Sequence, residues 1–408
     1  MQDVDEIARE TSTRRLSGRV HILGLGNVGC FVAHSLAWRQ SPPPITLMLH
    51  TPEFYEDFLR KKSCISINTN GLDDIKTGFD VNVFHNDSWR SIAYGSDADR
   101  KPKEALDILA SSEEDEGHIE CLVATVKANH TVNALKTVSH RLTADSTVCI
   151  LQNGMGTMEL LNREVFPDPS TRPNYLMGIV SHGLMRGEKF LIRHMGVGTT
   201  ILAPVARSSN VPAKPAESDT SWAPTTKYLL RLLTLTPQLV AVAERPTELI
   251  QYQLEKLAVN CVVNPLTALM DCKNGELLGH LSLTRVMRLL LFEISSVICA
   301  LPELQGVPGL EERFSPERLR QMAVKIMYKT RENSSSMLQD VQNARVTEIE
   351  FLNGYIVRRG EELGIKPVLN YTMMNLVKGK SFLAEARNDS AIPVDLMEDD
   401  DFRTDRDG

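Results

Sequence analysis

The spacing of apolar positions divides the chain into two parts with different patterns. In the first part, short apolar runs alternate with amphipathic stretches, which predicts strands alternating with helices. The expected strands are residues 19–23, 45–49, 119–126 and 147–151, and the expected helices are residues 31–38, 130–142 and 157–165. Such alternation predicts a parallel sheet with helices wound over both of its faces.

The pattern changes after the fourth strand. Apolar runs at residues 175–185, 190–194 and 199–202 predict consecutive strands that close this domain. From residue 245 onward the chain shows only helical periodicity. The expected helices there are residues 248–271, 283–301, 316–332, 348–363 and 371–386.

These patterns predict an α/β fold, with an N-terminal doubly wound sheet of the Rossmann type and an all-helical C-terminal domain. We expect the first domain to span residues 19–244 and the second to span residues 245–390. Residues 97–117 are densely charged and residues 206–225 are rich in Ser, Pro and Ala, so both are predicted to be inserted surface loops. Residues 1–18 are expected to be disordered, and residues 391–408 to form an acidic, frayed tail.

A glycine motif stands where the first strand meets the first helix. Gly24 permits a tight turn, Gly26 lets a pyrophosphate approach the backbone, and Gly29 lets helix and strand pack closely. The phosphates would then lie at the positive N-terminus of the helix. The strand–turn–helix context favours a dinucleotide site over a glycine-rich turn that binds nothing. The residues expected to contact the cofactor here are Gly24, Leu25, Gly26, Asn27, Val28 and Gly29.

Polar residues recur along the helix expected at residues 248–271. Lys256, Asn260 and Asn264 follow one another at intervals of four, which places them on one face. The residues around them are mostly apolar. Because Asn is a poor helix former and burial of an unpaired Lys is costly, the pattern favours a ligand-binding face. The alternative is a solvated polar stripe.

Composition narrows the classes of function. The chain has 408 residues, more than one usual domain, and its net charge of −7 argues against non-specific binding to nucleic acid. The seven cysteines include no CxxC pair, and we interpret them as reduced core thiols. No Asp, Glu and His cluster indicates a metal site, and no apolar stretch reaches membrane-spanning length. A cytoplasmic location is expected, and a mitochondrial one stays open.

Several segments, taken in order, carry a family resemblance. Beside the glycine loop and the Lys256 helix, they are ATVK at residues 124–127, LQNGMG at 151–156, SSMLQD at 335–340, TEIE at 347–350 and NG at 353–354. Together they make the chain resemble the ketopantoate reductases (2-dehydropantoate 2-reductases), of the fungal type with longer loops. The resemblance implies NADPH-dependent reduction of 2-dehydropantoate to pantoate, on the route to pantothenate, by a monomer or homodimer.

Reduction of a ketone needs a hydride at carbon, a proton at oxygen and donors for the growing oxyanion. Lys256 suits the acid role, because desolvation lowers the pKa of a lysine and its charge polarises a carbonyl. The resemblance implies the same role. We expect Glu348, on another helix, to hold Lys256 in place, and the resemblance also places Glu348 at the cofactor. The alternative for Glu348 is a carboxylate on a surface helix.

Five further residues are expected to contact the substrate or the cofactor. Asn260 and Asn264 would hydrogen-bond the hydroxyl and carbonyl side of the substrate. The resemblance implies that Ser336 binds the substrate carboxylate, although alone it would be interpreted as a helix N-cap. Asn153 follows a parallel strand, and the resemblance places it between nicotinamide and substrate; the alternative is a turn residue. Lys127 also follows a strand, near the cofactor by resemblance, and otherwise would be an exposed loop lysine.

One position departs from the family pattern. Many NADPH-specific relatives carry Arg at the end of the second strand, where it meets the 2′-phosphate, but here the strand ends at Leu49, His50 and Thr51. No Asp or Glu stands directly at the strand end to accept the ribose hydroxyls of NAD. NADPH is therefore expected, and its preference over NADH stays open.

The sequence leaves three functions in order of support. The first is reduction of 2-dehydropantoate; the second is reduction of another branched 2-oxo acid. The third is a non-catalytic dinucleotide-binding regulator on the same fold. Because the groups for hydride and proton transfer are divided between the two expected domains, we expect the active site in the cleft between them, with Lys256 facing Asn153. The expected partner is a small-molecule 2-oxo acid.

Overall fold

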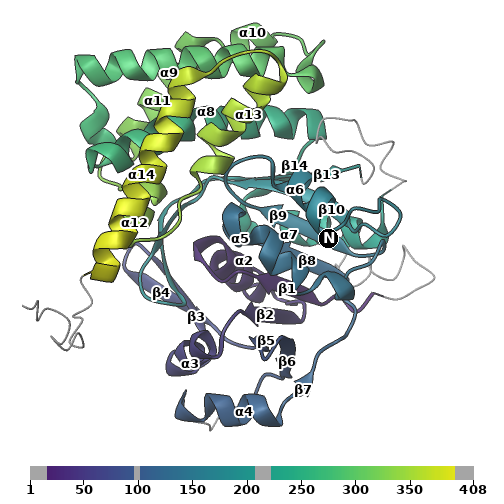
Figure 1. The fold of residues 1–408 in the computed structure, drawn as a ribbon. Helices are drawn as coiled ribbons and strands as arrows, with labels where there is room; N and C mark the ends of the chain where they lie inside the picture. The colour runs from purple at the N-terminus through teal and green to yellow at the C-terminus, as the bar shows by residue number, and fades with distance from the viewer. Residues whose placement is uncertain (1–15, 96–101, 207–221, 391–408) are drawn as a thin grey trace, which may run out of the picture. The chain divides into compact units, whose positions relative to one another are not determined.

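The computed structural model describes residues 16–95, 102–206 and 222–390 (Figure 1). The chain divides into two compact units. The first comprises the residues up to Leu257 together with Ile298–Leu310, and the second comprises Ala258–Val297 and the residues from Glu311 onward. The division falls within helix α8 (Pro246–Met270), so it groups Lys256 with the first unit. The domain limits expected from the sequence, residues 19–244 and 245–390, stay a prediction.

The first unit is built on a large sheet. Among the described residues it has ten strands, in the order β14-β13-β10-β9-β8-β1-β2-β5-β6-β7. The bounds are β1 Val20–Leu23, β2 Ile45–Leu49, β5 Asp80–His85, β6 Ser88–Ile92, β7 Glu113–Glu114, β8 Cys121–Ala124, β9 Thr147–Leu151, β10 Asn174–Val180, β13 Thr200–Val205 and β14 Ala241–Ala243. The strands from β10 to β5 pair in parallel, whereas β13 and β6 run antiparallel to their inner neighbours.

Helices cover both faces of this sheet (Figure 1). Successive residues of a strand point to opposite faces, and two buried clusters divide them accordingly. Val20 and Ile22 of β1 belong to the cluster with α2, α3 and α7, and Leu23 belongs to the cluster with α5 and α6. The helix bounds are α2 Asn27–Ala37, α3 Pro52–Arg60, α5 Ala128–Lys136, α6 Thr157–Glu164 and α7 Pro224–Thr234. The predicted α/β fold with a doubly wound sheet is confirmed.

A second sheet of the same unit has the order β11-β12-β3-β4. Its bounds are β3 Ile65–Thr69, β4 Leu72–Lys76, β11 Gly183–Arg186 and β12 Leu191–Gly196. Residues 175–185, 190–194 and 199–202, expected as consecutive strands of this domain, are confirmed as strands, and β11 and β12 pair with each other and with β3 rather than with the large sheet. Apolar spacing did not predict β3 and β4, because β4 is mostly polar and its residues are exposed or half-buried.

The segment at residues 97–117, predicted as a surface loop, is ordered structure where it is described. It contains the 3-10 helix η1 (Pro102–Glu104), helix α4 (Ala105–Ser111) and strand β7. Ala105, Ile108 and Leu109 are buried in the core of the first unit. These three residues are spaced so that they lie on one face of a helix, but the charged residues around them hide this pattern in the sequence. The loop prediction is wrong for this part, and residues 97–101 lie outside the described residues.

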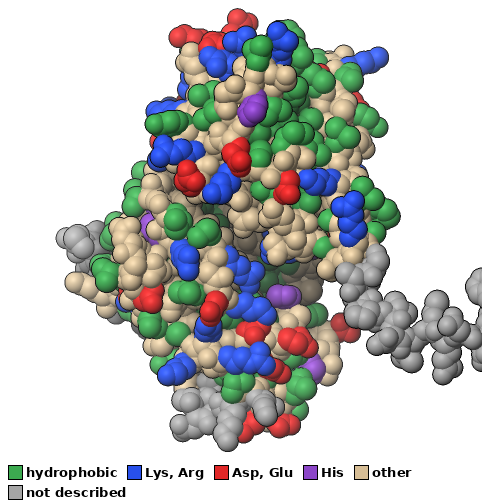
Figure 2. Space-filling view, turned by 90° about the vertical axis from the view of Figure 1, so that its left-hand side faces the viewer, with side chains coloured by type: hydrophobic (Ala, Val, Ile, Leu, Met, Phe, Trp, Pro, Cys, Tyr) green, Lys and Arg blue, Asp and Glu red, His purple; other side chains and the backbone are tan. Residues whose placement is uncertain are grey.

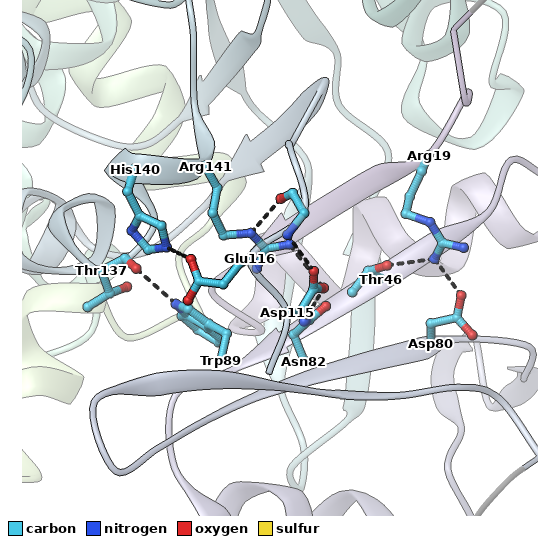
Figure 3. A network of polar contacts seen from close by, with 11 residues as sticks. Arg19, Thr46, Asp80, Asn82, Trp89, Asp115, Glu116, Thr137, His140 and Arg141 are labelled. Atoms are coloured by element: carbon cyan, nitrogen blue, oxygen red, sulfur yellow. Dashed lines mark hydrogen bonds and ion pairs between the residues drawn. The ribbon is translucent and has the colours of Figure 1, made fainter. Parts of the chain in front are cut away.

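A polar network also anchors this segment (Figure 3). Arg141 Nη2 lies 3.0 Å from a carboxylate oxygen of Asp115, and Arg141 Nε donates to Gly117 O at 2.8 Å. Asn82 Nδ2, on β5, donates to the same carboxylate at 2.7 Å. Burial opposes ionisation of Asp115, but the hydrogen bond from Asn82 and the charge of Arg141 outweigh it and lower the pKa. The network ties the end of the segment to the sheet.

The other expected insertion, at residues 206–225, lies largely outside the described residues, as do the N-terminal residues 1–15 and the acidic tail at 391–408. Where the structure resumes, Trp222 packs against the core and α7 begins at Pro224. Thr225 and Thr226 are buried, and each hydroxyl lies 2.8 Å from that of Thr147 on β9. The expected insertion therefore ends too late, because its last two residues, Pro224 and Thr225, already belong to α7.

The described part of the second unit contains helices and turns but no strand, so the predicted all-helical C-terminal part is confirmed. The helices that lie in it wholly or partly, besides α8, are α9 Leu281–Ala300, α10 Leu310–Arg313, α11 Pro316–Lys329, α12 Ser336–Gln342, α13 Asn353–Glu362 and α14 Val368–Ser390. The helix expected at residues 348–363 is divided into the 3-10 helix η7 (Ile349–Phe351) and α13. Leu352 separates them, because its ψ of −100° is not helical.

Apolar side chains also reach the surface. On α9 and α14 they include Leu289, Phe292, Tyr371 and Phe382. Figure 2 shows one face of the molecule, on which apolar side chains lie among charged ones. In the part of the chain that the structure describes, no helix is both long and apolar enough to cross a membrane.

Candidate active site

The three glycines of the motif have different surroundings. Gly24 has a φ of +97°, and a Cβ there would lie 2.6 Å from Val126 N. A Cβ on Gly29 would lie 2.0 Å from the carbonyl oxygen of Gly24. Both positions therefore require glycine for the fold itself. Gly26 is exposed and a Cβ there would meet nothing within 4 Å, so this glycine leaves open space at the turn.

That open space lies at the start of α2. Gly26 is the N-cap of this helix, no acidic residue stands in its first turn, and Gly26 offers no side-chain cap. Asn27 is held by its side chain, since Nδ2 donates to Leu184 O on β11 at 3.1 Å. Leu25 is buried and Val28 packs against the core. The residues present thus fit an anion at the helix N-terminus, approached over Gly26.

Lys127 and Asn153 lie at the same edge of the sheet as this loop. β8 pairs with β1 on one side and with β9 on the other, all in parallel, so the three carboxyl ends are adjacent. Lys127 follows β8 as the N-cap of α5, and Asn153 follows β9. Both are half-buried. Ligands of open parallel sheets bind at this edge.

Lys256 contacts this edge directly. Its Nζ donates to Asn153 Oδ1 at 2.8 Å and to Val180 O, at the end of β10, at 2.8 Å. An ammonium only donates, so Asn153 must turn its oxygen toward Lys256. The predicted proximity of Lys256 and Asn153 is confirmed. Sequence reasoning missed Val180, because a backbone carbonyl acceptor carries no signal in the residue type.

The polar positions of α8 are its only accessible ones over residues 254–268. Lys256, Asn260 and Asn264 are half-buried, and every other residue of that stretch is buried. Such a line of partly accessible amide and ammonium groups on a buried helix differs from a fully solvated stripe, which would widen to neighbouring positions. The pattern leaves these groups able to contact a ligand.

The second unit ties α8 to the start of α12. Ser335 is the N-cap of α12 and accepts from Leu338 N at 3.1 Å. The hydroxyl of Thr267, buried on α8, lies 2.7 Å from that of Ser335. Because Ser335 performs the capping, the alternative that we gave for Ser336 is wrong, and Ser336 is exposed in the first turn.

Glu348 lies just before η7 and is only 9% exposed. The alternative of a surface helix carboxylate is therefore wrong. A carboxylate at that depth is stable only with polar partners.

The end of β2 carries imidazole and ammonium groups. Burial lowers the pKa of His50, and the charges of His130 and Lys189 lower it further. The ring of His50 lies 5.2 Å from that of Phe54, and Lys189 Nζ lies 5.7 Å from the same ring. Glu53, in the first turn of α3, is the acidic residue nearest in sequence. Among the described residues, no group of His, Cys, Asp and Glu could hold a metal ion.

A doubly wound parallel sheet with a glycine loop after its first strand, and polar side chains at the neighbouring strand ends, defines a dinucleotide-binding α/β protein. Residues 20–207 match the family model of the ketopantoate reductases PanE/ApbA, and residues 248–381 match the model of their C-terminal part. The chain belongs to the ketopantoate reductase family. The family and the enzyme class expected from the sequence, an oxidoreductase of 2-oxo acids, are confirmed.

Relatives in this family carry two kinds of name. A "Probable 2-dehydropantoate 2-reductase" of Schizosaccharomyces pombe is 28% identical over 379 residues, which is 91% of this chain and 99% of the relative. The 2-dehydropantoate 2-reductase of Escherichia coli O157:H7 is 32% identical over 275 residues, 67% of this chain and 76% of the relative. The ketoisovalerate reductase of Gibberella fujikuroi is 28% identical over 374 residues, 83% of this chain and 77% of the relative.

Solved structures show the same fold. D-mandelate dehydrogenase with NADH and anilino(oxo)acetate aligns with a TM-score of 0.66 at 17% identity, over 90% of this chain and 99% of that one. A dimeric ketopantoate reductase from Staphylococcus aureus aligns with a TM-score of 0.61 at 16% identity, over the same shares of the two chains.

Proposed function

We propose that the chain catalyses the NADPH-dependent reduction of 2-dehydropantoate to pantoate. The observation that carries the proposal is the contact of Lys256 with Asn153 at 2.8 Å, on the strand edge that also holds the glycine loop. The contact supports the proposal because an ammonium at this edge would lie near a bound dinucleotide and could donate a proton. The names of the S. pombe and E. coli relatives support 2-dehydropantoate as the substrate.

A nicotinamide dinucleotide, when bound, supplies the hydride. Residues 24–29 would hold its pyrophosphate at the start of α2, with Lys127 beside it. Lys256 transfers one proton from Nζ to the carbonyl oxygen of the substrate. The amine that remains has two N–H groups, and Asn153 Oδ1 and Val180 O accept both. The same two acceptors therefore orient Lys256 before and after the transfer.

The remaining site residues are proposed from their chemistry. Asn260 and Asn264 donate to the hydroxyl and carbonyl side of the substrate, and Ser336 donates to its carboxylate. Their half-buried or exposed side chains support these roles, because a substrate ligand must stay accessible. Glu348 contacts the cofactor in this proposal, and its burial supports a role inside a polar site.

NADPH is preferred over NADH in this proposal. Two observations support it: residues 49–51 at the end of β2 include no Asp or Glu, and the charge of Lys189 reaches His50 there, together with that of Glu53. A 2′-phosphate is favoured by a cation such as the ammonium of Lys189, and a ribose hydroxyl pair is favoured by a carboxylate. Lys189 also forms an ion pair with Asp57, which weakens its field.

A second candidate function is reduction of another branched 2-oxo acid. The fungal ketoisovalerate reductase matches at the same 28% identity as the S. pombe relative, so identity alone does not separate the two. The test is the rate of NADPH oxidation by the purified chain with a panel of 2-oxo acids. The proposal expects the highest kcat/KM with 2-dehydropantoate. A higher value with 2-oxoisovalerate would establish the second candidate, and no turnover of any acid would leave the non-catalytic regulator.

The proposed assembly is a monomer or a homodimer. Exposed apolar side chains on α14, Tyr371 and Phe382 among them, are compatible with a second copy. The dimeric S. aureus enzyme supports the same possibility at the level of the fold.

A further inference from the structure

Helix α8 contains a proline, which interrupts the backbone hydrogen bonding of the helix. Pro265 stands in its interior and directly follows Asn264. Because proline has no N–H, the carbonyl four residues earlier, that of Cys261, loses its intrahelical donor. Cys261 is 0% exposed, so the surrounding protein has to replace that donor.

A side chain replaces it. Asn353 Nδ2 donates to Cys261 O at 2.9 Å. Asn353 is the first residue of α13 and is 0% exposed. Burial of an amide costs free energy unless the amide is hydrogen-bonded, and the hydrogen bond to Cys261 O offsets this cost for Asn353. The donor missing from α8 is thus supplied by another helix of the same unit.

Two further residues fix the orientation of the Asn353 amide. Glu293 on α9, which accepts from Leu369 N at 2.9 Å and from Asn370 N at 3.0 Å, also accepts from Asn370 Nδ2 at 2.9 Å. Asn370 therefore presents Oδ1 to Asn353, whose Nδ2 donates to it at 3.0 Å. Since both neighbours of the Asn353 amide are acceptors, its NH₂ group has to face them.

We propose that Asn353 is a positioning residue for the substrate-binding face of α8. Asn260 directly precedes Cys261 and Asn264 directly precedes Pro265, so the two carboxamides stand beside the two ends of the missing backbone hydrogen bond. The hydrogen bond from Asn353 to Cys261 O fixes the helix at this place, and with it the direction of both side chains. Glu293 and Asn370 hold the donor in place. This inference rests on the proposed function in one respect, that Asn260 and Asn264 bind the substrate.

The test is a double-mutant cycle with Asn353→Leu and Pro265→Ala. The Pro265→Ala substitution restores a backbone N–H to Cys261 O, so the side-chain donor becomes redundant. In the background that retains Pro265, we expect Asn353→Leu to raise KM for the keto acid about 10-fold, as loss of one oriented hydrogen bond does. We expect kcat and the Kd for NADPH to change less than about 3-fold. In the Pro265→Ala background the same substitution should change KM by less than about 3-fold.

The cycle has a control and a second readout. Asn375→Leu makes the same change at an exposed position of α14, where the amide donates to Tyr371 O of its own helix, and should leave KM unchanged. The melting temperatures of the variants in the cycle are measured without substrate. They therefore test the donor replacement even if the wild-type chain reduces none of the acids, which is the result that would overturn the proposed function. Asn353→Leu should lower it more in the background that retains Pro265 than in the Pro265→Ala background.

Equal effects of Asn353→Leu in the two backgrounds, on KM and on melting temperature, would overturn the inference. A rescued melting temperature with an unrescued KM would reduce Asn353 to a structural role and overturn the positioning claim. If Asn353→Leu alone does not fold, folding of the double variant supports the donor replacement, and failure of both overturns it.

Discussion

Gly24, Gly26 and Gly29 are one residue type in one loop, yet the structure separates their tasks. The contacts that a Cβ would make show that two of them are required by the fold and that Gly26 is not. The sequence predicts all three roles, because the motif requires glycine for the tight turn, for the approach of the pyrophosphate and for the close packing of helix and strand. It also predicts that Lys256 meets Asn153. It gives no sign of Val180, whose contribution is a main-chain oxygen.

Gly26→Val places a branched side chain where the pyrophosphate would approach. With φ at −79°, the backbone accepts valine, so the fold should survive while the affinity for NADPH falls at least about 100-fold. Isothermal titration with NADPH measures it. Gly379→Val is the matched control, since a Cβ there also meets nothing within 4 Å. An unchanged Kd in the Gly26 variant would mean that the cofactor binds elsewhere.

Lys256→Ala removes the proposed proton donor. We expect kcat to fall by roughly 10²–10⁴-fold, as loss of a positioned general acid does, with the Kd for NADPH nearly unchanged. Steady-state kinetics and fluorescence titration give the two numbers. Lys136→Ala, at an exposed position in the last turn of α5, is the control. Turnover near that of the wild type would remove Lys256 from the mechanism.

At the scale of elements, apolar runs were the reliable signal. Residues 45–49 and 147–151 were predicted with the bounds that β2 and β9 have, because strands buried on both faces are continuously apolar. Strands β3 and β4 gave no such run, and α4 was hidden by the charges around its three buried positions. In the candidate site, the side chains at the strand ends could also be predicted from the sequence. The capping by Ser335 rather than Ser336 could not be predicted, because it depends on local geometry.

Helix α4 offers a direct test of the corrected insertion. Leu109 is 0% exposed and Leu106, on the same helix, is 54% exposed. Leu109→Ala should lower the free energy of unfolding by about 2–5 kcal/mol, the usual result of a cavity in a core, and Leu106→Ala should change it little. Urea titration measures both. Equal, small effects would restore the view of this segment as a surface loop.

At the scale of the whole molecule, buried histidines make stability depend on pH. Burial, helped by the charge of Arg141, lowers the pKa of His21 from 6.5 to about 4. The unfolded chain therefore binds a proton between these values and the folded chain does not, so stability is present above the unfolded pKa and is lost as pH falls toward 4. His34, His182 and His194 have pKa values shifted in the same direction by burial.

His21→Gln should reduce this dependence. Between pH 7 and pH 5 the wild type is expected to lose on the order of 2 kcal/mol more unfolding free energy than the variant. Urea unfolding at the two pH values measures the difference. His280→Gln, at an exposed position, should keep the wild-type dependence. Identical slopes in the His21 variant and the wild type would show that His21 titrates normally in the fold.

The central claim is that this chain passes a hydride from a nicotinamide to the keto carbon of a 2-oxo acid. The most direct measurement supplies NADPH deuterated at both C4 positions, together with 2-dehydropantoate, and analyses the hydroxy acid by mass spectrometry. The account predicts one deuterium per product molecule, bonded to C2, and equal amounts of product and oxidised cofactor. Consumption of the cofactor without label at C2, or no hydroxy acid with this or any other 2-oxo acid of the panel, would contradict it.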